Sequence, residues 1–156
     1  MISSALFSDC KAHRFRLARI WNEEKETLLF IGLNPSRADH YTSDRTITKC
    51  ISYAQNWNYG GLTMVNLFSF ISPYPNELKR HTHLYTDENR KHIKEALESH
   101  EQVIFMWGNL PKFCTFDIEI FKDVKNPLCF RQNKNGMPTH PLYLPMNLKP
   151  KAYIFD

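Results

Sequence analysis

Three short, almost uninterrupted apolar runs constrain the fold of this chain more than any other feature. They lie at residues 27–33 (TLLFIGL), 62–67 (LTMVNL) and 102–108 (QVIFMWG), and longer segments separate them. Runs of this kind are typical of strands that are buried on both faces of a sheet. Because such strands are joined by helical crossovers, the pattern predicts an α/β fold with these three strands side by side.

The segments between the runs carry helical signals. Apolar side chains recur at helical spacing in residues 42–57, and polar residues at the start of this segment are good N-caps. A second helix is predicted over 86–99, with Thr86 as its cap and acidic residues in its first turn. Residues 110–123 predict a third helix.

The remaining segments complete the predicted sheet. Residues 15–21 indicate a partly exposed strand, and we expect it to form an antiparallel hairpin with 27–33, the central strand. Residues 128–131 predict a short strand, and the tail to Asp156 an edge segment. We therefore expect one domain over residues 1–156, with three α/β/α layers around a mainly parallel sheet.

The composition is that of a globular protein, with 42% hydrophobic and 23% charged residues. No apolar stretch is long enough to span a bilayer, and residues 1–16 lack a signal-peptide core, so we expect a cytoplasmic protein without a membrane partner. The four cysteines form no CxxC pair and are expected to be free thiols. The net charge of +4 mildly favours phosphate-bearing partners, and the sequence sets no oligomeric state.

The carboxyl end of the first apolar run carries the most informative loop, Gly32-Leu33-Asn34-Pro35-Ser36. Ligands of open α/β sheets bind outside the carboxyl ends of the strands. Glycine permits close approach of a ligand to the backbone, Asn34 can donate and accept hydrogen bonds, and Pro35 stiffens the turn. The alternative interpretation is a capped loop in which Asn34 satisfies backbone groups.

The other two runs end in a similar way. Asn66 interrupts the second run, just before Phe68, and a buried amide needs partners. It is expected either to support the neighbouring loop or to face a ligand. The third run ends at Trp107-Gly108. These endings predict one shared site at the carboxyl edge of the sheet.

A fourth candidate loop is His140-Pro141-Leu142. A residue before proline is held in an extended backbone, so the imidazole of His140 projects from a rigid loop. The alternative is a loop histidine that packs against neighbouring aromatic residues.

Other polar clusters favour structural roles. Short acidic segments before a helix are usually caps, and paired imidazoles without a cysteine or carboxylate partner at ligand spacing are usually surface residues. Alternating arginines on a strand indicate either a phosphate-facing ribbon or a solvated edge. The acidic segment contains Asp39, His40 and Asp44, and the paired imidazoles are those of His81 and His83. The alternating arginines are Arg14, Arg16 and Arg19. No metal site is predicted.

The motifs together resemble a bacterial and phage family of unknown function, and they extend along nearly the whole chain. The matching elements are a strand of the form R-x-x-L-x-R-x-W, a GLNPS loop, a D-x-T-I helix start, and VNLF, WG and HPLYLP segments; they occur here at residues 14–21, 32–36, 44–47, 65–68, 107–108 and 140–145. This family implies no settled activity.

More distantly, the same order of motifs is similar to the uracil-DNA glycosylase superfamily, whose mismatch-specific branch has a G-I-N-P loop and a closing H-P-S loop. This resemblance implies that Asn34 positions a water molecule. It implies that His140 hydrogen-bonds the base carbonyl and stabilises charge on the departing base. It also suggests that Phe68 stacks on a flipped base.

The chain departs from that superfamily at several positions. Ser36 and Arg37 replace small residues, Leu142 replaces the serine of the H-P-S loop, and the activating-loop aspartate of the most active branch is absent. Arg37 either supplies a substitute phosphate contact or closes the pocket to a nucleic-acid chain. Duplex DNA is therefore a less favoured substrate than the resemblance alone implies.

The predicted function is recognition of a nucleobase in a nucleotide or nucleic acid, with hydrolysis of the N-glycosidic bond and no metal or organic cofactor. The alternative is a non-catalytic nucleotide or nucleic-acid binding module on the same fold. We expect Asn34 and His140, the catalytic candidates, to face one another across one pocket. The substrate-binding candidates are Gly32, Leu33, Pro35, Ser36, Arg37, Asn66, Phe68, Trp107, Gly108, Pro141 and Leu142.

Overall fold

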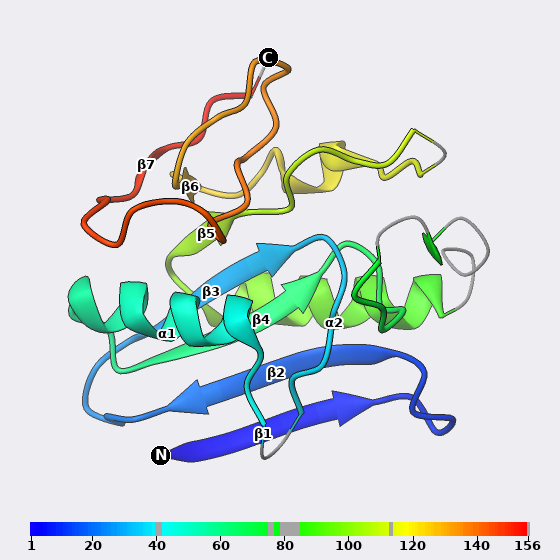
Figure 1. The fold of residues 1–156 in the computed structure, drawn as a ribbon, viewed down its shortest axis with the longest axis horizontal. Coiled ribbons are helices and arrows are strands. Elements are labelled where there is room, and N and C mark those ends of the chain that lie inside the picture. Colours follow the sequence, from blue (N-terminus) through cyan, green and yellow to red (C-terminus); the bar gives the residue numbers. More distant parts are fainter. Residues whose placement is uncertain (40–41, 75–76, 79–84, 113, 156) are drawn as a thin grey trace.

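The computed structural model describes residues 1–39, 42–74, 77–78, 85–112 and 114–155. It shows a seven-stranded sheet in the order β1-β2-β4-β3-β5-β6-β7, with one α-helix on each face (Figure 1). The strands are β1 (Ile2–Phe7), β2 (Arg14–Ile20), β3 (Thr27–Gly32), β4 (Gly61–Asn66), β5 (Val103–Phe105), β6 (Leu128–Cys129) and β7 (Lys151–Ala152).

The three apolar runs form the adjacent parallel strands β4, β3 and β5, as predicted. Alternate side chains of β3 supply two different cores. Leu28 and Phe30 pack with α1 (Arg45–Asn56), whereas Leu29 and Ile31 pack with α2 (Thr86–Ser99) on the opposite face. A strand with a core on each side has no solvent-facing position, which explains its uninterrupted apolar sequence.

The sheet is mixed, so the expectation of a mainly parallel sheet is wrong. β4, β3, β5 and β6 are joined in parallel pairs, whereas β1–β2, β2–β4 and β6–β7 are antiparallel pairs. The short connection from β1 to β2 can link only antiparallel strands. The sequence of β1, ISSALF, carries too little apolar signal to reveal this additional strand.

The predicted hairpin between the second and third strands is also wrong. β2 pairs with β4, so β4 lies between β2 and β3. The apolar run of β4 is buried along its whole length and gains a hydrogen-bonded neighbour on each side. Residues 21–26 provide enough chain to pass the width of one strand.

The two predicted helices are confirmed, and the cap of the first is as predicted whereas that of the second is not. Asp44 caps α1, since its side chain accepts a hydrogen bond from the Ile47 N–H. α2 begins at Thr86 as predicted, but its N-cap is Tyr85, which has a left-handed φ of 57° and makes no side-chain capping bond. No helix in the described part of the chain has the length and apolar character needed to cross a membrane.

The third helix predicted over residues 110–123 is wrong. Its described part contains only a short 3-10 helix, Ile118–Phe121, which begins after Asp117. β-branched and aromatic residues are frequent in this segment and have low helix propensity. Packing of its aromatic side chains against Trp107 and Phe105 holds the segment over the α2 side of the sheet. All four cysteines are free thiols, as predicted.

Candidate functional site

A pocket of about 680 Å³ lies at the carboxyl edge of the parallel strands, a volume typical of small-molecule sites. Gly32 at the end of β3, Asn66 at the end of β4, and Met106 and Trp107 after β5 all line it. The start of α1 and the loop that carries His140 close its sides. The three strand endings therefore meet at one site, as the sequence predicted.

The structure brings most of the predicted site residues to this pocket. Those that line it are Gly32, Leu33, Asn34, Pro35, Ser36, Arg37, Asn66, Trp107, His140 and Leu142. Three others lie elsewhere. Phe68 is buried on the α2 side, where it meets Phe116 edge to face, so it is not placed to stack on a ligand in this pocket. Pro141 is buried, and Gly108, with φ of 69°, lies directly beside His140.

Asn34 is fixed by its own side-chain nitrogen. Nδ2 donates to the carbonyl oxygens of Pro35, Phe70 and Ser72 at 3.1, 3.3 and 2.9 Å. The nitrogen thus joins the loop after β3 to the segment after β4. This agrees with the alternative interpretation of the sequence, in which Asn34 satisfies backbone groups. Among the described residues nothing donates to Oδ1, so the oxygen is left as a hydrogen-bond acceptor.

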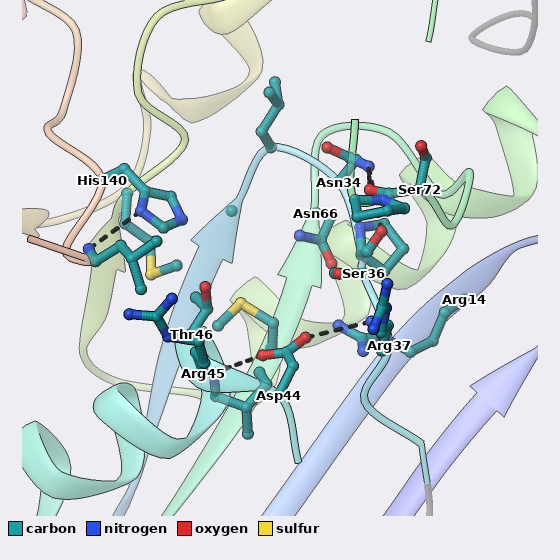
Figure 2. Close-up of a pocket in the computed structure, with 18 of the residues that line it drawn as sticks. Arg14, Asn34, Ser36, Arg37, Asp44, Arg45, Thr46, Asn66, Ser72 and His140 are labelled. Atoms are coloured by element: carbon teal, nitrogen blue, oxygen red, sulfur yellow. Dashed lines mark hydrogen bonds between the residues drawn. The ribbon is translucent and has the colours of Figure 1, made fainter. Parts of the chain in front are cut away.

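His140 faces Asn34 across the pocket from the other side (Figure 2). The Leu142 N–H donates to its Nδ1 at 3.2 Å, so the proton of the neutral ring lies on Nε2. His140 is exposed at the surface, but partial desolvation by the surrounding pocket lowers its pKa; Asp44 opposes this shift, and Lys49 adds to it. The imidazole is therefore neutral at neutral pH, with an Nε2–H donor.

Side chains of α1 hold the His140 loop in place, a feature that the sequence analysis missed. Lys49 Nζ donates to the carbonyl oxygens of Leu142, at 2.8 Å, and Leu144. Tyr53 donates its hydroxyl to the Pro145 carbonyl at 2.7 Å. Lys49 and Tyr53 are four residues apart and so lie on one face of α1. That spacing was visible in the sequence, but their partners were not.

Asn66 is the polar residue on the pocket floor. It is only 5% exposed, and no hydrogen bond joins its side-chain amide to another described residue. Its backbone carbonyl instead accepts from Asn89 of α2 at 2.9 Å. Gly32 leaves room for the amide, since a Cβ there would lie 2.8 Å from Asn66 Nδ2. A buried amide normally has partners, so this one is available to a ligand.

Arg14 also lines the pocket, so the solvated edge, one of the two interpretations of these arginines, does not hold for it. β1 covers β2 and makes it an interior strand. The register of the β1–β2 pair shifts between Leu6, which pairs with Arg16, and Phe7, which pairs with Arg14. Phe15 is therefore an extra, unpaired residue. This irregularity reverses the strand face at Arg14. Arg14 is therefore buried on the pocket side, whereas Arg16 remains exposed.

The electrostatics of the site are dominated by arginine. Arg14, Arg37 and Arg45 line the pocket, and Asp44 is the carboxylate among its lining residues. Asp44 Oδ1 accepts from Ile47 N–H at 2.9 Å, and Oδ2 accepts from Arg37 N–H at 3.4 Å. Its predicted role as a cap is thus confirmed. No cluster of metal-ligating side chains occurs in the described residues, and His40, His81 and His83 lie outside them.

A sequence profile described as "Protein of unknown function (DUF1643)" matches residues 14–142. The chain belongs to the DUF1643 family. The matched DUF1643 region begins at Arg14 and ends at Leu142, and both of these residues line the pocket. The predicted membership of a family of unknown function is therefore confirmed. No curated protein and no solved structure matches the chain.

Proposed function

We propose that the pocket recognises a nucleobase of a nucleotide or nucleic acid and hydrolyses its N-glycosidic bond. The observation that carries this proposal is the side-chain amide of Asn66, which lies on the pocket floor and has no hydrogen bond to another described residue. An amide offers a donor and an acceptor side by side, which complements the edges of nucleobases. The thioethers of Met64 and Met106 line the same pocket and supply polarisable surface for a base.

Asn34 and His140 have complementary roles in the proposed reaction. Oδ1 of Asn34 accepts a hydrogen bond from a water molecule and orients it towards the anomeric carbon. The N-glycosidic bond breaks, and its electron pair leaves with the base. His140 Nε2–H donates to the base and stabilises this charge. The water oxygen then bonds to carbon, and its proton passes to solvent or to the departing base.

The arrangement of motifs supports the proposal. The Gly32–Ser36 loop and the His140 loop oppose one another across the pocket, as the resemblance to uracil-DNA glycosylases implies. Strand endings that meet at one carboxyl edge are the usual ligand position in α/β sheets.

A non-catalytic nucleotide-binding module is the second candidate, and one observation favours it. Both oxygens of Asp44 accept hydrogen bonds from backbone N–H groups, so the carboxylate among the pocket residues already has partners. Asn34 Nδ2 is likewise committed to backbone carbonyls. A site without an available general base is better suited to binding than to rapid hydrolysis.

The two functions can be separated with a panel of modified DNA, RNA and free nucleotides, with released bases identified by mass spectrometry. If the site is catalytic, Asn34→Ala should reduce turnover about 100-fold, on the order of 3 kcal/mol of barrier, and should reduce it more than it weakens ligand binding. Asn66→Ala should weaken binding of the base. Asn56→Ala, at an exposed position of α1, is the matched control.

The outcomes are distinct once circular dichroism has shown that each variant is folded. Binding that depends on Asn66, with no base released from any substrate, would establish the binding module. An absence of both binding and base release throughout the panel would refute nucleobase recognition.

A further inference from the structure

The pocket carries positive charge that the carboxylate among its lining residues neutralises only in part. Arg14 of β2 and Arg37 of the loop after β3 lie together, whereas the side chain of Arg45, the first residue of α1, extends on the other side of Asp44, towards His140 (Figure 2). Arg37 and Arg45 are exposed and can adjust to a ligand, whereas Arg14 is fixed by burial. Arginines that meet from separate elements are typical of phosphate recognition.

Arg14 is a buried cation without an ion pair. It is 2% exposed, its Nη1 donates to the Ala38 carbonyl at 2.8 Å, and its Nε has no hydrogen-bond partner. No ion pair to it forms among the described residues. Burial lowers its pKa to about 10, and the nearby Asp44 only partly offsets this. An unpaired buried charge is unfavourable, and an anion in the pocket would relieve that cost.

The first turn of α1 adds backbone donors to the same pocket. The Asp44 side chain accepts from Ile47 N–H, the third residue of the helix. The N–H groups of Arg45 and Thr46 precede it and have no carbonyl partner within the helix. Both residues line the pocket. Backbone donors at the positive end of a helix are well suited to an anion.

Asp44 neutralises this positive charge only in part, because it is one carboxylate against three arginines and forms no ion pair with Arg14 among the described residues. Its Oδ1 is directed to Ile47 N–H and its Oδ2 to Arg37 N–H, so both oxygens already accept from the backbone. Three guanidinium groups and one carboxylate leave a net positive charge on these lining residues, which an anion that is not part of the protein would balance.

We infer that the part of the pocket beside Arg14 is a phosphate subsite formed by Arg14, Arg37 and the first turn of α1, towards which the exposed side chain of Arg45 can turn. The inference rests on the proposed function for the identity of the rest of the ligand. It narrows the class of ligand. If a base binds at Asn66 and a phosphate binds beside Arg14, the ligand is a nucleotide unit, and an unphosphorylated nucleoside or a free base should bind more weakly.

Isothermal titration calorimetry with inorganic phosphate, five common nucleosides and their 5′-monophosphates tests the inference at low and at moderate salt. We expect the preferred monophosphate to bind at least about tenfold more tightly than its nucleoside, since phosphate gains several charge-assisted hydrogen bonds. The advantage should decrease as salt rises, and inorganic phosphate should compete.

Matched arginine variants show which residues give the monophosphate its tighter binding. Arg45→Gln and Arg37→Gln should each reduce the phosphate advantage several-fold and leave nucleoside binding unchanged. Arg16→Gln removes the same charge from an exposed position of β2 and should have no effect. Arg14→Gln should remove most of the advantage. If that buried substitution prevents folding, the double variant of Arg37 and Arg45 decides the question.

The outcomes separate this inference from the proposed function. Equal binding of nucleosides and monophosphates, with no response to inorganic phosphate, would overturn the phosphate subsite and leave base recognition standing. Binding of phosphate and of every monophosphate alike, unaffected by Asn66→Ala, would support the subsite and refute base recognition. A phosphate advantage that survives in all the pocket arginine variants would also overturn the assignment.

Discussion

A methyl group at Gly32 should report directly on how tightly the Asn66 amide is held. A Cβ at this position would lie 2.8 Å from Asn66 Nδ2, but at 3.7 Å from both Met106 Cε and Met64 Sδ. Only the first of these distances is a clash. The φ of Gly32 is not positive, so alanine introduces no backbone strain there. The expected cost therefore comes almost entirely from displacement of one side chain.

The magnitude follows from the identity of the displaced group. Overpacking of a buried site costs about 1–3 kcal/mol, and Gly32→Ala should lie near the lower limit because an amide end can shift more easily than backbone. In an Asn66→Ala background the clashing atom is absent, so the cost of Gly32→Ala should nearly vanish. The double-mutant cycle should therefore give a coupling energy of about 1 kcal/mol.

Urea unfolding followed by tryptophan fluorescence measures all four proteins of the cycle. Gly32→Ala combined with the exposed Asn56→Ala is the control, and those two effects should simply add. Additive effects for Gly32 and Asn66, within about 0.5 kcal/mol, would show that the amide does not occupy the space above Gly32. The description of the pocket floor would then be incorrect.

Two further predictions concern stability. Asp44→Ala should lower the free energy of unfolding by about 0.5–2 kcal/mol through loss of the α1 cap. Asp44→Asn keeps a hydrogen-bond acceptor and should retain most of that stability. Equal losses for the two variants in urea unfolding would contradict the capping role. Burial lowers the pKa of His100, whose Nε2 lies 2.9 Å from Thr63 Oγ1, so the folded state favours the neutral ring. The contribution of His100 to the free energy of unfolding should be fully present above the unfolded pKa of about 6.5. It should decline as the pH falls through the lower folded pKa. His100→Gln should flatten this decline in unfolding curves measured from pH 7.5 to 5, and an unchanged slope would refute the assignment.

Local sequence was sufficient wherever the determining interaction is local. The apolar runs identified β3, β4 and β5, because strands buried on both faces leave no position for polar side chains. Helical periodicity located α1 and α2, and the glycine and asparagine at the strand ends marked the edge where the pocket lies. The Asn34 and His140 loops were recognised because proline fixes the backbone beside each of them.

Tertiary structure decided which elements meet. Nothing in the sequence of β2 indicates that β4 will lie beside it, because apolar patterning reports burial and not the identity of the neighbour. The unpaired Phe15 brings Arg14 to the pocket, and the carbonyls that Lys49 binds lie more than 90 positions away. The availability of the Asn66 amide likewise depends on what surrounds it in three dimensions. Residue type and periodicity thus determined the candidate groups, whereas strand order and long-range packing determined which of them share a pocket.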